Sequence, residues 1–82
     1  MKCVRCYDNG GSTLDRYTAI YLDQPERGKN VFAARGMSEF PCHPQGFGQF
    51  TAAVPGPHLG KCIAFSKLPE ACQKLVKADR KE

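Results

Sequence analysis

The sequence predicts an α+β fold in which a small antiparallel β-sheet of three to five strands packs against one C-terminal helix. Three observations lead to this prediction: short β-prone segments occupy the chain before residue 66, turn-forming Gly, Asn, Asp and Pro residues separate them, and an amphipathic helical pattern follows. The 82 residues should make a single domain, residues 1–82, because one core divides into two only in much longer chains.

Three segments predict an antiparallel meander. Residues 2–7, "KCVRCY", are β-prone, and the "DNGG" that follows contains residues that accept the positive φ of a tight turn. Residues 15–22, "DRYTAIYL", carry apolar or aromatic side chains on both faces, which predicts a central strand. After a charged loop at 23–30, residues 31–35 predict the returning strand.

The second half of the sheet is predicted from two short segments and the loop before them. Residues 50–54, "FTAAV", and 61–65, "KCIAF", are the candidate strands. The segment 36–49, "GMSEFPCHPQGFGQ", contains three glycines and two prolines, too many interruptions for regular structure. Because long ordered loops in small domains usually serve binding or catalysis, we expect a functional loop here.

The C-terminal helix is predicted from the spacing of its apolar residues. Ser66 is the predicted N-cap, and Pro69 is tolerated because amides in the first turn have no acceptor within the helix. The last four residues, "DRKE", should fray. Four apolar residues at i, i+4, i+7 and i+8 share one helical face: Leu68, Cys72, Leu75 and Val76.

The charge and the N-terminus limit the partners and the compartment. The net charge of +4 lies mostly in residues 42–82, which carry six basic and three acidic side chains, against six and five in residues 1–41. This balance favours acidic partners and disfavours DNA mimicry. No apolar run approaches the ~18 residues of a membrane span, and "MKCVRCYDNGG" lacks the apolar stretch of a secretory signal. We therefore expect a cytoplasmic protein with no membrane partner, whose five cysteines are thiols.

A zinc site is the sharpest chemical alternative. Cys3 and Cys6 have the two-residue spacer of a tetrahedral site, but an extended strand would point them to opposite faces. We therefore expect both thiols to pack in the core, with no metal and no cofactor. The ligands that would complete the alternative site are Cys42 or His43, together with His58 or Cys62.

Catalysis has weaker support in the sequence. Cys42 and His43 are adjacent, and neighbouring side chains rarely meet as a nucleophile and its base. Asp8 and Asp15 flank a glycine turn, where short acidic side chains usually bond the backbone two residues on. We therefore predict no enzymatic activity.

Two kinds of macromolecular binding remain open. Nucleic-acid binding would use the helix lysines and four scattered basic residues, with Tyr7, Phe47 and Phe50 as stacking groups. Protein binding would use the 36–49 loop, whose aromatic and polar side chains resemble interface anchors, unless its phenylalanines turn inward and plug the sheet. The four basic residues are Arg5, Arg16, Arg35 and Lys61, and the candidate anchors are Met37, Phe40, Phe47 and Gln49.

Three strings resemble a family of small, largely uncharacterised bacterial, phage and plasmid proteins. They are "CYDNGGSTLDRYT" at 6–18, "GMSEFPCHPQGFGQ" at 36–49 and "HLGKCIAFSKLPEACQKLV" at 58–76, and together they span most of the chain. By context, the resemblance implies a mobile-element or phage protein. Small non-enzymatic proteins of that kind commonly bind and block a host machine, and anti-CRISPR proteins are one such group.

We therefore predict an accessory protein that binds another macromolecule, with a host-defence nuclease complex as one candidate. A protein partner is expected first, acting in the cytoplasm of the host cell if the protein is phage-encoded. A zinc-stabilised nucleic-acid-binding module is the alternative, and the oligomeric state is left open. The predicted binding residues are His43, Gln45, Phe47 and Gln49, with Arg16, Arg35, His58 and Lys61 as neighbours.

Overall fold

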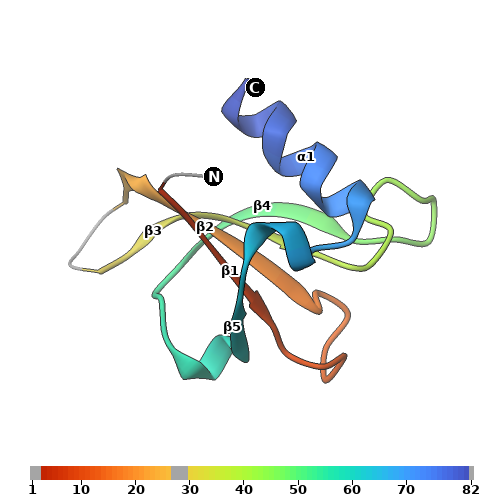
Figure 1. Cartoon of the computed structure of the whole chain (residues 1–82), viewed down its shortest axis with the longest axis horizontal. Coiled ribbons are helices and arrows are strands. Elements are labelled where there is room, and N and C mark those ends of the chain that lie inside the picture. Colours follow the sequence, from red (N-terminus) through yellow and green to blue (C-terminus); the bar gives the residue numbers. More distant parts are fainter. Residues whose placement is uncertain (1–2, 27–29, 82) are drawn as a thin grey trace.

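The computed structural model describes residues 3–26 and 30–81, and in them one antiparallel sheet packs against one α-helix (Figure 1). The strands occur in the sheet in the order β4-β3-β2-β1-β5. The predicted α+β class is confirmed, with five strands. The elements are β1 (Val4–Asp8), β2 (Tyr17–Pro25), β3 (Phe32–Met37), β4 (Gly48–Ala53), β5 (Lys61–Ile63) and α1 (Glu70–Arg80), with short 3-10 helices η1 (Pro57–Leu59) and η2 (Phe65–Lys67).

The central strand β2 has the two apolar faces that its sequence predicts. Tyr17, Ala19 and Tyr21 lie on the face under α1, in a core that also contains buried residues of β3 and α1. Ile20 lies on the opposite face and is fully buried there. The meander β1-β2-β3 is therefore confirmed, with β2 between the other two strands.

A crossing segment covers the sheet face away from α1. β1 to β4 follow one another as hairpins, but β5 lies at the far edge, beside β1. Residues 54–60, which include η1, must therefore cross from one edge to the other. Leu59 of this segment packs against the small cluster formed by Tyr7, Ile20 and Ala34.

The helix begins later than its sequence predicts. Leu68 and Pro69 are both extended, with ψ of 147° and 148°, and α1 starts at Glu70 with no side-chain cap. The predicted cap at Ser66 is wrong because the residue before a proline is forced out of the helical region, so Ser66 lies in η2 instead. The apolar face is confirmed, since Leu68, Cys72 and Val76 are buried. None of the helices in the described segments has the length and apolar character of a membrane span.

The end of α1 is bonded to the sheet, so the predicted fraying is wrong at two positions. The Asp79 carboxylate accepts hydrogen bonds from Arg35 of β3, at 2.9 Å from Nε, and from the Tyr21 hydroxyl. Arg80 donates to Asp23 of β2 and lies over the Tyr21 ring. These bonds hold the last turn of the helix against the middle of the sheet.

Candidate functional site

The loop between β3 and β4, residues 38–47, is closed at its base by two hydrogen bonds. The Ser38 amide donates to the Phe47 carbonyl at 2.7 Å, and the Phe47 amide donates to Ser38 Oγ at 2.8 Å. The Ser38 carbonyl also lies 3.2 Å from Sγ of Cys72, which ties the base to α1. The base of the loop is therefore fixed to both layers of the fold.

The tip of the same loop is folded by its own backbone. The His43 amide donates to the Phe40 carbonyl at 3.1 Å, and the Gly46 amide donates to the His43 carbonyl at 2.7 Å. Nδ1 of His43 accepts from the Gln45 amide at 3.1 Å. A Cβ atom at Gly46 would lie 1.9 Å from the Phe40 carbonyl oxygen, so only glycine fits this close approach.

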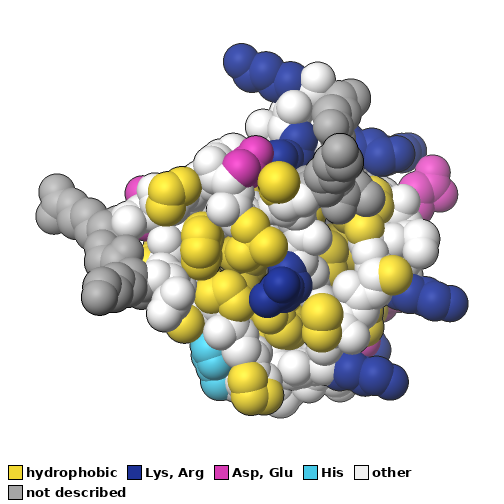
Figure 2. All heavy atoms as spheres, turned by 60° about the vertical axis from the view of Figure 1, so that its left-hand side comes forward, with side chains coloured by type: hydrophobic (Ala, Val, Ile, Leu, Met, Phe, Trp, Pro, Cys, Tyr) yellow, Lys and Arg dark blue, Asp and Glu magenta, His cyan; other side chains and the backbone are white. Residues whose placement is uncertain are grey.

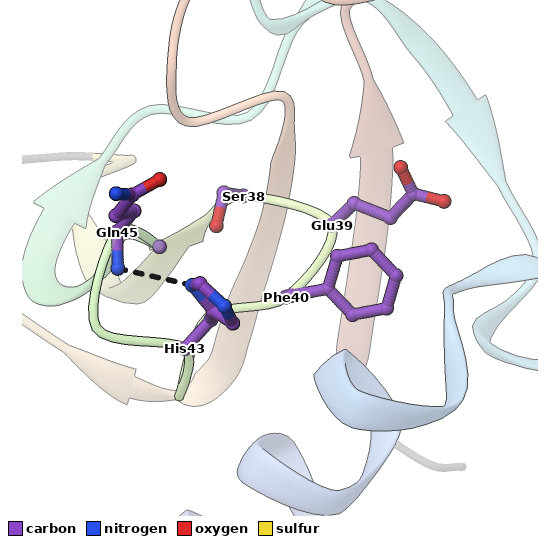
Figure 3. A pocket seen from close by; sticks show the side chains of 6 residues that line it. Ser38, Glu39, Phe40, His43 and Gln45 are labelled. Atoms are coloured by element: carbon purple, nitrogen blue, oxygen red, sulfur yellow. Dashed lines mark hydrogen bonds between the residues drawn. The ribbon is translucent and has the colours of Figure 1, made fainter.

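The folded loop encloses a small open hollow and exposes one aromatic ring. In Figure 3, Glu39 and Phe40 project from one arm of the loop, and His43 and Gln45 project from the other. The hollow has a volume of about 240 Å³, which is below the ~300–1,000 Å³ of typical small-molecule sites. Phe40 is 61% exposed beside it. This geometry suits insertion of a side chain from another protein.

The structure divides the predicted loop anchors into surface and interior. His43 and Gln45 line the hollow together, and Gln49 is exposed on β4. Phe47 is half-buried at the loop base, and Met37 is fully buried under α1, so Met37 is wrong as an interface anchor. The alternative that the phenylalanines plug the sheet is wrong for Phe40, whose ring faces solvent.

Two predicted neighbours of the binding loop, Arg16 and Arg35, form ion pairs within the fold. Arg35 donates to Asp79 and stacks on Phe50. Arg16 donates from Nε to Asp8 Oδ1 at 2.8 Å. Both guanidinium groups therefore already have a carboxylate partner inside the fold.

Asp8 is a turn cap, as its sequence predicts. It accepts from the Gly10 amide at 2.8 Å, and Asn9 accepts from the Gly11 amide at the same distance. The hydrogen bond from Arg16, supported by that from Gly10, lowers the pKa of Asp8. The carboxylate is therefore ionised and already bonded, which makes it a poor general base.

The remaining predicted residues, His58 and Lys61, lie apart from the loop. His58 is in η1 and Lys61 begins β5, next to a second hollow of about 450 Å³ on the face away from α1. Figure 2 shows a face on which hydrophobic side chains gather around one basic side chain. The predicted binding set therefore does not form one continuous site. The second hollow is lined by Arg5, Tyr7, Gly56, Pro57, Gly60 and Cys62.

The cysteines separate into buried and exposed thiols. Cys6 and Cys72 are buried in the core, and burial raises the pKa of each thiol to about 11. Cys3 is exposed, so the prediction that both opening thiols pack in the core holds for Cys6 and is wrong for Cys3. Within residues 3–26 and 30–81, no three His, Cys, Asp or Glu side chains come together as metal ligands. The other exposed thiols are Cys42 and Cys62.

Comparisons of the chain with protein-family models, with curated proteins and with solved structures find no match. The chemistry of the 38–47 loop is therefore the basis on which a function can be proposed.

Proposed function

We propose that this protein is a small, non-enzymatic accessory protein that binds another protein through the 38–47 loop. The observation that carries the proposal is the exposed Phe40 ring on a loop that is already fixed by its own hydrogen bonds. A solvent-exposed ring loses contact with water when a partner covers it, which is favourable. Because the loop is preorganised, binding costs little ordering entropy.

The hollow beside Phe40 supplies the second half of the contact. His43 and Gln45 place a polar ring and an amide at its wall, where they can orient a partner side chain that enters. A protruding aromatic ring next to a small recess resembles the centre of many protein interfaces, in which each partner inserts an anchor into the other.

Binding rather than catalysis is supported by the state of the reactive groups. The core thiols have raised pKa values and stay protonated at neutral pH, and Asp8 is engaged by Arg16. His43 uses Nδ1 to hold the loop. Each of these groups serves packing or local structure, so none is poised as a nucleophile or base.

We extend the proposal to the kind of partner and the compartment. The resemblance to phage and plasmid proteins favours a host-defence complex as the target, with inhibition of the anti-CRISPR type as the result. The net charge of +4 favours an acidic surface on the target. Five free cysteines suit a reducing compartment, which supports action in the cytoplasm.

The test is capture of a partner from a bacterial host lysate by the tagged protein and by two matched variants. Phe40→Ala removes the exposed ring of the loop. Leu14→Ala removes a comparably exposed side chain, 63% exposed, from the turn between β1 and β2. We expect the native chain and Leu14→Ala to retain the same protein and Phe40→Ala to lose it. Retention by Phe40→Ala, or equal loss by Leu14→Ala, would count against the loop as the binding surface.

A further inference from the structure

The outer edge of β4 carries backbone groups that β3 does not pair, and the alternation of the sheet ladder identifies them. One of these groups, the Gly48 carbonyl, accepts a long hydrogen bond of 3.5 Å from Arg35 Nη1. The bond from the Ser38 amide to the Phe47 carbonyl marks these two residues as a hydrogen-bonded pair. Bonded and non-bonded pairs alternate along an antiparallel ladder, so every second residue of β4 from Gln49 onward is bonded to β3. The residues whose amide and carbonyl groups point away from β3 are therefore Gly48, Phe50 and Ala52.

The residues of β4 itself lack the features that usually block strand addition. β4 contains no proline and no charged residue, and its six pairs with β3 run without a shift in register. Five of its six residues are exposed. The opposite edge differs, because β5 has three residues and the same alternation leaves only Cys62 facing outward.

We propose that β4 pairs with β4 of a second copy of this chain, antiparallel and across a two-fold axis at Phe50. Only this register lets all three outward-facing residues meet outward-facing residues. Phe50 lies opposite Phe50 of the partner subunit, and Gly48 lies opposite Ala52 of the partner subunit. The two five-stranded sheets then form one continuous sheet.

The side chains of β4 complement themselves in this register. Gly48 and Ala52 are small and leave room for the Phe50 rings, which are 51% exposed in the single chain and become covered. On the other face, Gln49 lies opposite Thr51 of the partner subunit, where amide and hydroxyl can form a hydrogen bond across the strands. Each copy carries a net charge of +4, but β4 contributes no charged side chain to the seam. The Arg35 guanidinium that stacks on Phe50 is already paired with Asp79 of its own chain. These features favour a second copy over an unrelated strand as the occupant.

The first measurement is the mass of the native chain in solution by light scattering, from micromolar to millimolar concentration. A reductant must be present because exposed thiols could link copies covalently. We expect a monomer at low concentration and a dimer at high concentration. Amide exchange followed by NMR should slow at Phe50 and Ala52 as the dimer forms.

Two variants and one control locate the contact. Ala52→Pro removes an outward amide and leaves the bonds to β3 intact. Thr51→Lys places two like charges about 7–8 Å apart across the seam. Ser12→Lys adds the same charge to the exposed turn between β1 and β2. Both β4 variants should weaken the dimer at least tenfold and the control should not.

Three results would overturn the proposal: a monomer at every concentration, a dimer unchanged in Thr51→Lys, or slowed exchange elsewhere than on β4. Thr51→Lys decides the matter if Ala52→Pro does not fold by circular dichroism. The inference is independent of the proposed function, because Phe40→Ala should dimerise like the native chain.

Discussion

Two regions of the molecule differ in the sequence separation of the residues that their hydrogen bonds join. One is the contact between α1 and the sheet, and the other is the 38–47 loop. In the helix contact, the hydrogen bonds of Asp79 reach back 44 residues to Arg35 and 58 residues to Tyr21. In the loop, the bond from Phe47 to Ser38 spans nine residues. Long-range bonds form only when the whole fold forms, whereas short-range bonds fix a local surface. Substitutions in the two regions should therefore separate stability from binding.

The largest loss of stability should come from Met37→Ala, at the end of β3. Met37 is fully buried under α1, so its truncation leaves a cavity and should lower the free energy of unfolding by about 2–5 kcal/mol. Urea unfolding followed by circular dichroism measures the change. A loss below about 1 kcal/mol would mean that α1 relaxes to fill the space.

The next largest loss should come from Asp79→Asn, which keeps the shape and removes the charge. Arg35, whose side chain is only 16% exposed, would then lack its counter-ion, and we expect a loss of about 2–3 kcal/mol because water still reaches part of the pair. Glu70→Gln is the matched control on the same helix, where the exposed pair with Lys74 should contribute less than about 1 kcal/mol. Equal effects of the two variants would contradict the role given to Asp79.

The same carboxylate should make stability depend on pH. Burial would raise the pKa of Asp79, but the hydrogen bonds from Arg35 and Tyr21 outweigh it and the pKa lies below its usual value. The stabilisation is therefore present above the unfolded pKa of about 3.9 and is lost as the pH falls through the lower folded pKa. Unfolding in urea at neutral pH and at about pH 3 should show a smaller difference for Asp79→Asn than for the native chain. An unchanged difference would point to other carboxylates.

The smallest change should come from Phe40→Ala, only three residues after Met37. Because the ring faces solvent, the free energy of unfolding should change by less than about 0.5 kcal/mol while partner capture is lost. Differential scanning calorimetry of Phe40→Ala and Leu14→Ala makes the comparison. A marked fall in melting temperature for Phe40→Ala alone would place that ring in the folded core.

The elements of the fold are predictable from the sequence because periodicity and turn chemistry act locally. The alternation in 15–22 predicts a strand with two apolar faces, and β2 has them. Boundaries are less predictable: β2 continues to Pro25, and α1 starts after Pro69. Pairing with β3 carries β2 as far as Pro25. The extended backbone at Leu68, forced by Pro69, delays the start of α1.

The candidate site is predictable only where it is continuous in sequence. His43 and Gln45 belong to one loop, so their proximity follows from the chain itself. The pairing of Arg35 with Asp79 joins residues that lie 44 positions apart, and no local sequence pattern predicts it. The exposure of Phe40 depends on the turn at Gly46, which composition alone does not specify.

The division of the thiols offers a way to watch the fold open. Cys6 lies on β1 and Cys72 on α1, in the one core where the two layers meet, and both thiols stay protonated. An alkylating reagent added to the native protein should modify Cys3, Cys42 and Cys62 first. Modification of the two buried thiols, Cys6 and Cys72, should follow as two further mass increments that appear together, at the rate at which α1 separates from the sheet.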